Sequence, residues 1–239
     1  AQREKVSILT QLGRITAHDL RTPLSVININ LHLILRSGDA EFVRDRASKI
    51  EEQVQKLNSM IDDLQLISRL EAGMTPHWES ISANNLITHT VEQLERMRAS
   101  RKIQIDCILA PNMPEFESDM YYLSSSLFAL VENAFLYTPM HGQVTIRTWY
   151  AAEQVHISVQ DNGIGITPEE REHIFDPFFK GENASRVEGT GAGLGLSIVR
   201  RVIAMHGGSI EVDSQPGVGS IFTLHLPLHP IPHDTDPIL

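Results

Sequence analysis

The sequence lacks the features that would indicate a disulfide-bonded protein, a membrane-spanning protein or a protein that binds polyanions. Its 239 residues include one cysteine, so no internal disulfide can form. No apolar run approaches the roughly 18 to 20 residues that cross a bilayer, and the N-terminus shows no signal-peptide pattern. The formal net charge of −10 argues against nucleic acid or an anionic membrane as a partner.

We therefore expect this polypeptide to be cytoplasmic, with membrane attachment only through missing upstream segments, if at all. Hydrophobic residues make up 41% of the chain, which is enough for a substantial core. The single cysteine, Cys107, lies in an alternating apolar run and is predicted to be a small core residue.

The first third of the chain carries a seven-residue repeat, which predicts long helices that pack along one stripe. One row holds Val6, Gly13, Leu20, Ile27 and Ile34, and a second row holds Leu9, Thr16 and Pro23. We expect one helix from about Arg3 to Ser37, bent by Pro23 just after His18, and a second helix that ends near Glu71. Two such hairpins would bury their stripes in a dimeric four-helix bundle, and a monomeric helical cap is the alternative.

A histidine lies outside this stripe. His18 follows Gly13 by five residues, and this spacing turns its side chain away from the stripe and toward water. Asp19 comes next, so a carboxylate lies beside a solvent-facing imidazole for which packing gives no reason. The alternative is a surface histidine without a role.

Beyond Ala72 the pattern changes to that of an α/β domain. Helical periodicity covers residues 84–100 and 193–206, and Ser118-Asp119 caps a helix that ends at Tyr137. Apolar alternation predicts strands over residues 78–82, 102–109, 115–118, 143–150, 154–160, 209–212 and 220–226. The fold class is therefore α plus α/β, with a helical hairpin followed by an α/β sandwich. The predicted domains are 1–72 and 78–228, with a linker over 73–77 and a disordered tail over 229–239.

Three stretches of the second domain are suited to a phosphorylated ligand. Asp161-Asn162-Gly163-Ile164-Gly165-Ile166 places a carboxylate beside two glycines, which let backbone approach a ligand closely. Gly189-Thr190-Gly191-Ala192-Gly193-Leu194-Gly195 runs into a helix start, where N–H groups favour phosphate oxygens. In Glu132-Asn133-Ala134, a helix-borne amide can offer oxygen to a hard cation.

With their order and spacing, these motifs resemble the catalytic core of sensor histidine kinases, whose ATP-binding domain is of the Bergerat or GHKL type. The resemblance covers the whole chain apart from the tail. His18-Asp19-Leu20-Arg21-Thr22-Pro23-Leu24 resembles the H-box, Asn133 with Tyr137-Thr138-Pro139 the N-box, and Phe175-Asp176-Pro177-Phe178-Phe179 the F-box. The stretches from Asp161 and from Gly189 resemble two glycine boxes, and Gly217, Gly219 and Phe222 fit a third.

The resemblance implies an ATP-dependent kinase that phosphorylates itself on His18 within a homodimer. It would then pass the phosphoryl group to an aspartate of a response-regulator receiver domain. Asp19 would orient the imidazole and accept its proton, and Thr22 would position water to dephosphorylate the regulator. Asp161 would accept from the adenine amino group, Tyr137 would lie against the base, and Asn133 would hold Mg²⁺.

The other nucleotide-binding residues implied by the resemblance are Gly163, Gly165, Gly189, Gly191, Gly193, Leu194 and Gly195. Lys180 and Arg186, in the loop before the second glycine box, either reach the phosphates or are solvated charges.

Two positions depart from the family pattern. Ala129 stands where many members carry a second asparagine, and Leu136 stands where a lysine is common. Both losses weaken contacts to the metal and the phosphates, so a degenerate kinase acting as a dimeric signalling scaffold is the alternative function. A net phosphatase, suggested by Thr22, is a third. Because gyrase-like ATPases carry a water-activating glutamate at the position of Ala129, free ATP hydrolysis is not expected.

Overall fold

The structure is a computed structural model that describes residues 20–72, 75–184, 187 and 192–230. The chain divides into two compact units, Ala1–Leu66 and Ile67–Leu239. The predicted order, a helical region followed by an α/β domain, is confirmed. No helix in the described ranges is both long enough and apolar enough to cross a lipid bilayer.

The first unit contains a helical hairpin. Residues 20–36 form one helix, and α2 (Ala40–Glu71) follows after three residues, which confirms the predicted second helix and its end. Asp39 accepts the backbone N–H of Glu41 at 3.0 Å and so caps the start of α2. On the first helix, the stripe residue Pro23 is buried, whereas Leu20, Ile27 and Ile34 are half-buried. The expected start near Arg3 and the bend after His18 lie outside the described residues.

A buried amide links the two helices of the hairpin. Asn30 is 5% exposed, and its Nδ2 donates to the carbonyl oxygen of Val26 at 2.8 Å. Its Oδ1 accepts from the guanidinium of Arg46 on α2 at 3.4 Å, and that guanidinium also lies 4.8 Å from the ring centroid of Phe42. Asn30 also occupies the next position of the row that contains Pro23. A polar pair at such a position specifies the register of the two helices.

The second unit is an α/β sandwich, as predicted. Its elements are β1 (Glu79–Ile81), α3 (Ala83–Gln93), α4 (Glu95–Arg101), β2 (Gln104–Leu109), β3 (Phe116–Ser118), α5 (Met120–Tyr137), β4 (Gln143–Ala151), β5 (Gln154–Asp161), α6 (Pro168–Arg171), α7 (Gly195–Met205), β6 (Ser209–Gln215) and β7 (Gly219–Pro227).

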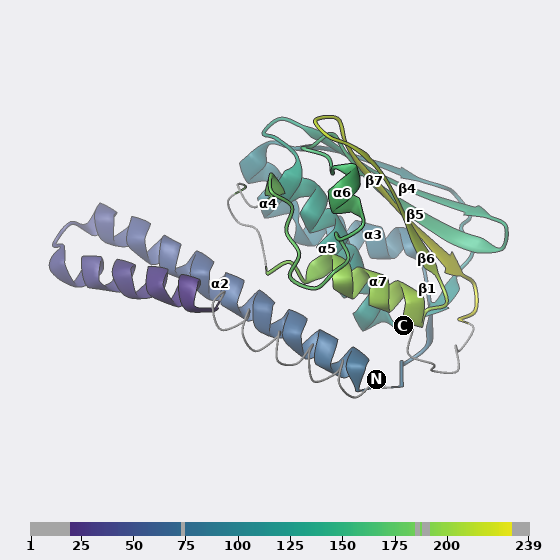
Figure 1. Ribbon diagram of the computed structural model, residues 1–239, viewed down its shortest axis with the longest axis horizontal. Coiled ribbons are helices and arrows are strands. Elements are labelled where there is room, and N and C mark those ends of the chain that lie inside the picture. Colours follow the sequence, from purple (N-terminus) through teal and green to yellow (C-terminus); the bar gives the residue numbers. More distant parts are fainter. Residues whose placement is uncertain (1–19, 73–74, 185–186, 188–191, 231–239) are drawn as a thin grey trace. The chain divides into compact units, whose positions relative to one another are not determined.

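Five of these strands form one sheet in the order β2-β4-β5-β7-β6, and β1 pairs with β3 in a small second sheet. The β2–β4 pair is parallel, and the other pairs are antiparallel. Helices α3, α5 and α7 lie on one face of the five-stranded sheet (Figure 1). The core lies between these two layers, where alternate strand residues meet the apolar faces of the helices.

The predicted helix over residues 84–100 is two helices. The chain leaves helical geometry at Leu94, whose φ of −91° and ψ of 4° end α3 and begin α4. Leu94 is buried, and apolar residues keep a helical spacing on both sides of the break. Since the hydrophobic period runs unbroken through the kink, the sequence pattern could not reveal it.

The prediction that Cys107 is a core residue is wrong, because its side chain is exposed. The register pairs Cys107 with Ile146 on β4, which is buried. Cys107 therefore lies on the face of the sheet that the apolar alternation predicts. However, β2 is an edge strand of the sheet and has a neighbouring strand on one side only. Alternation in the sequence does not distinguish an edge strand from a central one.

Candidate functional site

A carboxylate lies at the end of β5, the central strand of the five-stranded sheet. Asp161 is 8% exposed, and its Oδ1 accepts the backbone N–H of Gly163 at 2.8 Å. Burial raises the pKa of this carboxyl, and backbone hydrogen bonds from Gly163 and Ser220 act in the opposite direction. Asp161 is therefore a buried acceptor, oriented by backbone groups.

Three glycines allow neighbouring chain segments to close around Asp161. A Cβ on Gly163 would overlap the carbonyl oxygen of Tyr137, and a Cβ on Gly165 would overlap that of Gln215. At Gly219, a Cβ would overlap the carbonyl oxygen of Asp161 itself. Gly165 and Gly219 also have positive φ values of 65° and 132°, which side-chain-bearing residues rarely adopt.

Backbone hydrogen bonds fix these segments to one another. The N–H of Ile164 donates to the carbonyl oxygen of Tyr137 at 3.2 Å, and the N–H of Gly217 donates to that of Ile164 at 2.8 Å. The loop after β5 is thereby held between the end of α5 and the turn before β7.

Helix α5 brings an amide and a phenol to the same place. Its start is capped by Asp119, and near its other end Asn133 and Tyr137 lie one turn apart, so they share a helix face. Both side chains are half-buried. Burial raises the pKa of Tyr137, and the nearby carboxylate of Glu132 adds to this shift.

The start of α7 lies against this face of α5. A Cβ on Gly195 would lie 3.4 Å from the Cβ of Ala129 and 3.9 Å from Nδ2 of Asn133. Leu194, which precedes the helix, is buried and gives no side-chain cap. Within the described residues, no side-chain hydrogen bond caps the start of α7, and N–H groups at such a helix start suit an anionic ligand.

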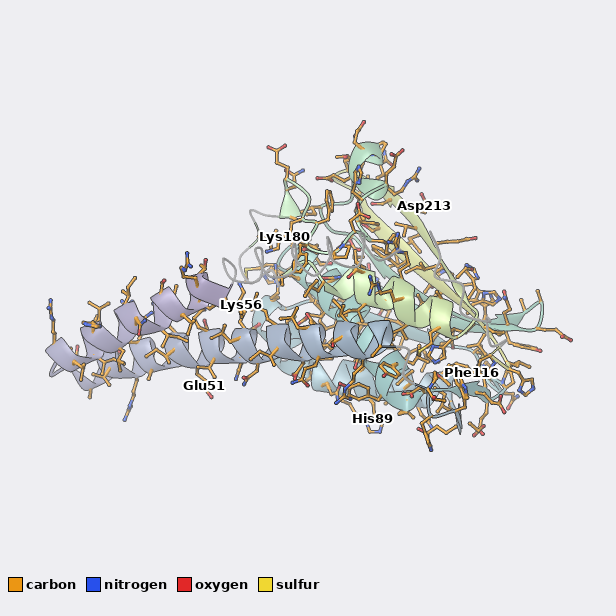
Figure 2. The ribbon with its side chains drawn as sticks, turned by 60° about the horizontal axis from the view of Figure 1, so that its bottom comes forward. Glu51, Lys56, His89, Phe116, Lys180 and Asp213 are labelled. Atoms are coloured by element: carbon orange, nitrogen blue, oxygen red, sulfur yellow. The ribbon has the colours of Figure 1, made fainter. Side chains whose placement is uncertain are left out.

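The segment after β5 forms a short helix and then a loop. Glu170 and Thr167 make a capping box at the start of α6, with the N–H of Thr167 donating to Glu170 Oε2 at 3.2 Å. Glu170 Oε1 also accepts the N–H of Glu182 at 2.8 Å, so one carboxylate joins α6 to the following loop. Lys180 lies on this loop (Figure 2).

The loop is also tied to the second glycine stretch. The N–H of Phe178 donates to the carbonyl oxygen of Gly193 at 2.9 Å. Gly193 has a φ of 77°, and a Cβ there would lie 2.8 Å from the carbonyl oxygen of Phe179. A residue with a side chain at position 193 would therefore push the loop away.

These elements surround a pocket. It is lined by Asn133, Ala134, Tyr137, Asp161, Ile164, Gly165, Ile166, Glu170, Ile174, Phe179, Lys180, Gly181, Asn183, Ala184, Leu196, Ser220 and Phe222. The walls are largely apolar, with a few polar groups that converge from different elements, as is typical of a small-molecule site.

Five of the predicted nucleotide-binding residues line this pocket, namely Asn133, Tyr137, Asp161, Gly165 and Lys180. Gly163 donates its backbone N–H to Asp161, and Gly193 and Leu194 lead to Gly195, which starts α7 beside Asn133. Thr22 is exposed on the helix of residues 20–36, in the other unit. His18, Asp19, Arg186, Gly189 and Gly191 lie outside the described residues.

Sequence reasoning missed Glu170, which lines the pocket and holds the following loop. The signal was available, because Thr167-Pro168-Glu169-Glu170 has the spacing of a capping box. The apolar wall residues Ile174 and Phe222 were not singled out as site residues, since nothing in their sequence distinguishes them from core residues.

The pocket's amide group can be tested as a metal ligand. Within the described ranges, no group of three or more His, Cys, Asp or Glu side chains could hold a metal ion. Asn133 offers one amide oxygen, and Ala129, one turn earlier, offers none. A single protein ligand fits Mg²⁺, which takes one or two ligands from the protein when phosphates and water complete its coordination shell.

Two protein-family profiles match the chain. Residues 8–73 match the "His Kinase A (phospho-acceptor) domain", and residues 121–230 match the "Histidine kinase-, DNA gyrase B-, and HSP90-like ATPase".

Curated relatives and solved structures are similar over most of the chain. The sensor-like histidine kinase SenX3 of Mycobacterium tuberculosis is 35% identical over 88% of this chain and 52% of its own length. The solved catalytic domain of histidine kinase ThkA is 30% identical over 64% of this chain and 97% of that domain, with a TM-score of 0.57.

A structure of histidine kinase ThkA in complex with response regulator protein TrrA covers more of the chain. It is 25% identical over 96% of this chain and 65% of ThkA, with a TM-score of 0.75. The chain spans about half the length of the curated relatives it matches.

Proposed function

Since the chain belongs to the histidine kinase family, we propose that it transfers the γ-phosphoryl group of ATP to His18 and then to an aspartate of a response-regulator receiver domain. The observation that carries this proposal is the convergence of the N-box, first glycine-box and F-box motifs on one pocket, which is lined by Asn133, Tyr137, Asp161 and Phe179. Because ATP is its substrate, this part of the chain would work in the cytoplasm.

The chemistry of the pocket suits a purine nucleotide. The carboxylate of Asp161 accepts from the adenine amino group, and its buried setting excludes competing water. Tyr137 and the apolar wall residues lie against the base. The uncapped start of α7 and the Lys180 ammonium face the phosphates, whose negative charge both favour.

Asn133 would hold Mg²⁺ through its amide oxygen. When bound, the ion would supply positive charge that offsets the negative charge developing on the phosphates during transfer. The chain's own residues orient the nucleotide: Asp161 fixes the base, and the start of α7 lies within reach of the opposite end of the ligand.

In the transfer step, a ring nitrogen of His18 forms a bond to the γ-phosphorus while the bond from that phosphorus to the β–γ bridging oxygen breaks. The attacking nitrogen is the one without a proton. ADP leaves, and the proton of the other ring nitrogen passes to Asp19, which acts as general base. An aspartate oxygen of the receiver domain then displaces His18 from the phosphorus. Thr22, which is exposed, would position water to remove the phosphoryl group from the regulator.

We also propose that the chain acts as a homodimer. Apolar side chains remain exposed along both helices of the hairpin, including Leu24, Leu31 and Leu35 on the first and Val54 and Ile61 on α2. Leu24 and Leu31, and likewise Val54 and Ile61, are seven residues apart, so they recur on one helix face. A second hairpin would cover these faces in a four-helix bundle.

The test is incubation of the chain with γ-labelled ATP and Mg²⁺. We expect acid-labile label in the wild-type protein and none in His18→Gln. His32→Gln, which alters a histidine on the helix of residues 20–36, is the control and should label normally. Label that persists in His18→Gln would refute the proposal.

A degenerate kinase that acts as a dimeric scaffold is the second candidate. Ala129 and Leu136 favour it, since neither can contact a metal or phosphate and Leu136 is buried. Measurable label on His18 excludes this candidate, whereas a dimer that binds ATP but never labels would support it.

A further inference from the structure

One carboxylate holds two separate segments of the second unit. Asp119 is 6% exposed, and its Oδ1 accepts the N–H of Tyr122 at 3.2 Å, which caps α5. Its other oxygen, Oδ2, accepts the backbone N–H of His77 at 2.8 Å. Asp119 therefore fixes both the start of α5 and the direction of the chain just before β1.

His206 supports Asp119 from the end of α7. Its ring is 1% exposed, and its Nε2 accepts the backbone N–H of Asp119 at 3.2 Å and lies 2.8 Å from the hydroxyl of Ser118. Its Nδ1 lies 2.7 Å from the carbonyl oxygen of Val202. Because a backbone N–H only donates and a carbonyl only accepts, the imidazole is neutral and carries its proton on Nδ1.

The same imidazole contacts the residue after His77, which is the first residue of the predicted second domain. The ring of Trp78 meets that of His206 edge to face, with centroids 5.1 Å apart and an angle of 86°. Asp119 and His206 together, here called the linker anchor, thus hold residues 77 and 78 through one hydrogen bond and one ring contact.

Two helices connect the linker anchor with the pocket. Helix α5 starts at Asp119 and carries Asn133 and Tyr137 near its other end, whereas α7 starts beside the pocket and ends at His206. At 1.5 Å per residue, they span about 27 and 17 Å. The two helices pack on each other (Figure 1). The pocket and the anchor therefore lie at opposite ends of this helix pair.

We propose that Asp119 and His206 are positioning residues for phosphoryl transfer. By holding the backbone at His77, they fix the direction of the segment between α2 and β1, and so how often the γ-phosphoryl group reaches His18. This inference rests on the proposed kinase function. Transfer requires an in-line approach of about 3 Å, and a misplacement of 1 Å can cost about 100-fold in rate.

The test compares two substitutions at one position of the full chain. His77→Pro removes the N–H that donates to Asp119, and His77→Ala keeps it while removing the exposed side chain. Asp119→Asn is a second probe, because asparagine caps a helix as well as aspartate but its NH₂ group would face the N–H of His77. The rate of His18 phosphorylation is measured against ATP concentration, together with the affinity for a fluorescent ATP analogue.

We expect His77→Pro and Asp119→Asn to lower the maximal rate at least about 10-fold, with the KM for ATP and the analogue affinity within about twofold of wild type. His77→Ala should match the wild type. Unchanged maximal rates in His77→Pro and Asp119→Asn would overturn the inference, as would a loss of analogue affinity that accounts for the whole effect. If the wild-type chain forms no phosphohistidine, the proposed function fails instead, which separates the two outcomes.

Discussion

At the scale of single residues, Asp161, the proposed acceptor for the adenine amino group, destabilises the fold at neutral pH. Burial raises the pKa of its carboxyl above the ordinary 3.8, so the ionised form is disfavoured in the folded protein. The contribution of this group to stability is therefore greatest below the unfolded pKa and is lost as the pH rises through the folded pKa. At neutral pH the buried negative charge of Asp161 therefore destabilises the folded protein. A hydrogen bond from the amino group of a bound ligand would stabilise this charge.

Asp161→Asn should therefore separate stability from binding. The amide retains an oxygen for the N–H of Gly163, so the melting temperature without nucleotide should stay equal or rise at pH 7. Nucleotide affinity should fall about 10- to 100-fold, since a hydrogen bond to a charged group contributes about 1.5 to 3 kcal/mol. Thermal melting with and without a non-hydrolysable ATP analogue measures both effects. Asp213→Asn, at an exposed residue of β6 (Figure 2), is the control, and a normal nucleotide-induced shift in Asp161→Asn would contradict the assignment.

Two glycines with similar backbone angles should respond differently to substitution. Gly165 and Gly217 have φ values of 65° and 75°, but only at Gly165 would a Cβ meet backbone atoms. Gly217→Ala should lower the free energy of unfolding by about 1 kcal/mol, the cost of the left-handed conformation. Gly165→Ala should lower it by about 2 to 4 kcal/mol, because the turn at Gln215 must also shift. Urea unfolding followed by tryptophan fluorescence compares the two, and equal losses would contradict the close approach at Gly165.

At the scale of elements, the end of α7 gives the fold a dependence on pH. Burial lowers the pKa of His206 from its ordinary 6.5, although its hydrogen bond to Val202 and the charge of Asp119 oppose this. The unfolded chain then takes up a proton below about pH 6.5 that the folded protein does not bind. Stability should therefore be fully present above pH 6.5 and fall as the solution is acidified.

We expect this contribution to reach a slope of about 1.4 kcal/mol per pH unit, the value for one proton. Urea unfolding of the full chain between pH 7.5 and 5 measures it through Trp78 and Trp149, which both belong to the second unit. His206→Gln keeps an acceptor for the N–H of Asp119 but cannot titrate, so its slope should be smaller. His89→Gln, at an exposed histidine of α3, should keep the wild-type slope. Equal slopes for wild type and His206→Gln would exclude His206 as the source.

Sequence reasoning predicted elements well where local chemistry decides them. The cap at Asp119, the end of α2 at Glu71 and the turn between the strands predicted over 143–150 and 154–160 all depend on residues close to them in sequence. The break at Leu94 depends on packing from both sides, and the exposure of Cys107 depends on strand order. Neither the helix break nor the exposure of Cys107 leaves a local sequence pattern, so neither could be predicted from the sequence.

In the candidate site, too, local features could be predicted from the sequence and features that depend on the tertiary fold could not. Each motif could be recognised from the sequence, because glycines beside an aspartate and an amide on a helix are chemically distinctive. That Gly219 makes room for the carbonyl group of Asp161 depends on the β5–β7 register, which no motif specifies. The apolar wall from Ile174 and Phe222 likewise follows from the tertiary fold.

At the scale of the whole molecule, the exposed apolar face of the hairpin predicts its oligomeric state. Leu35 is 76% exposed and Leu31 is 46% exposed, although both are large aliphatic residues. The double substitution Leu31→Glu and Leu35→Glu should convert the proposed dimer into a monomer, because burying carboxylates in a bundle is costly. Sedimentation velocity measures the change, and circular dichroism should show unchanged helix content.

Val218→Glu, at an exposed apolar residue of the second unit, is the matched control and should remain dimeric. A wild-type chain that sediments as a monomer at all accessible concentrations would refute the proposed assembly.

The turn between β4 and β5 has a practical consequence. Ala152 and Glu153 both have positive φ, and the register places this turn at the opposite end of the two strands from Asp161, which pairs near Gln143. A fluorescent reporter inserted between these two residues would leave the nucleotide-binding end of the sheet intact. The protein thus offers a natural attachment point for following the movements of the unit during turnover in real time.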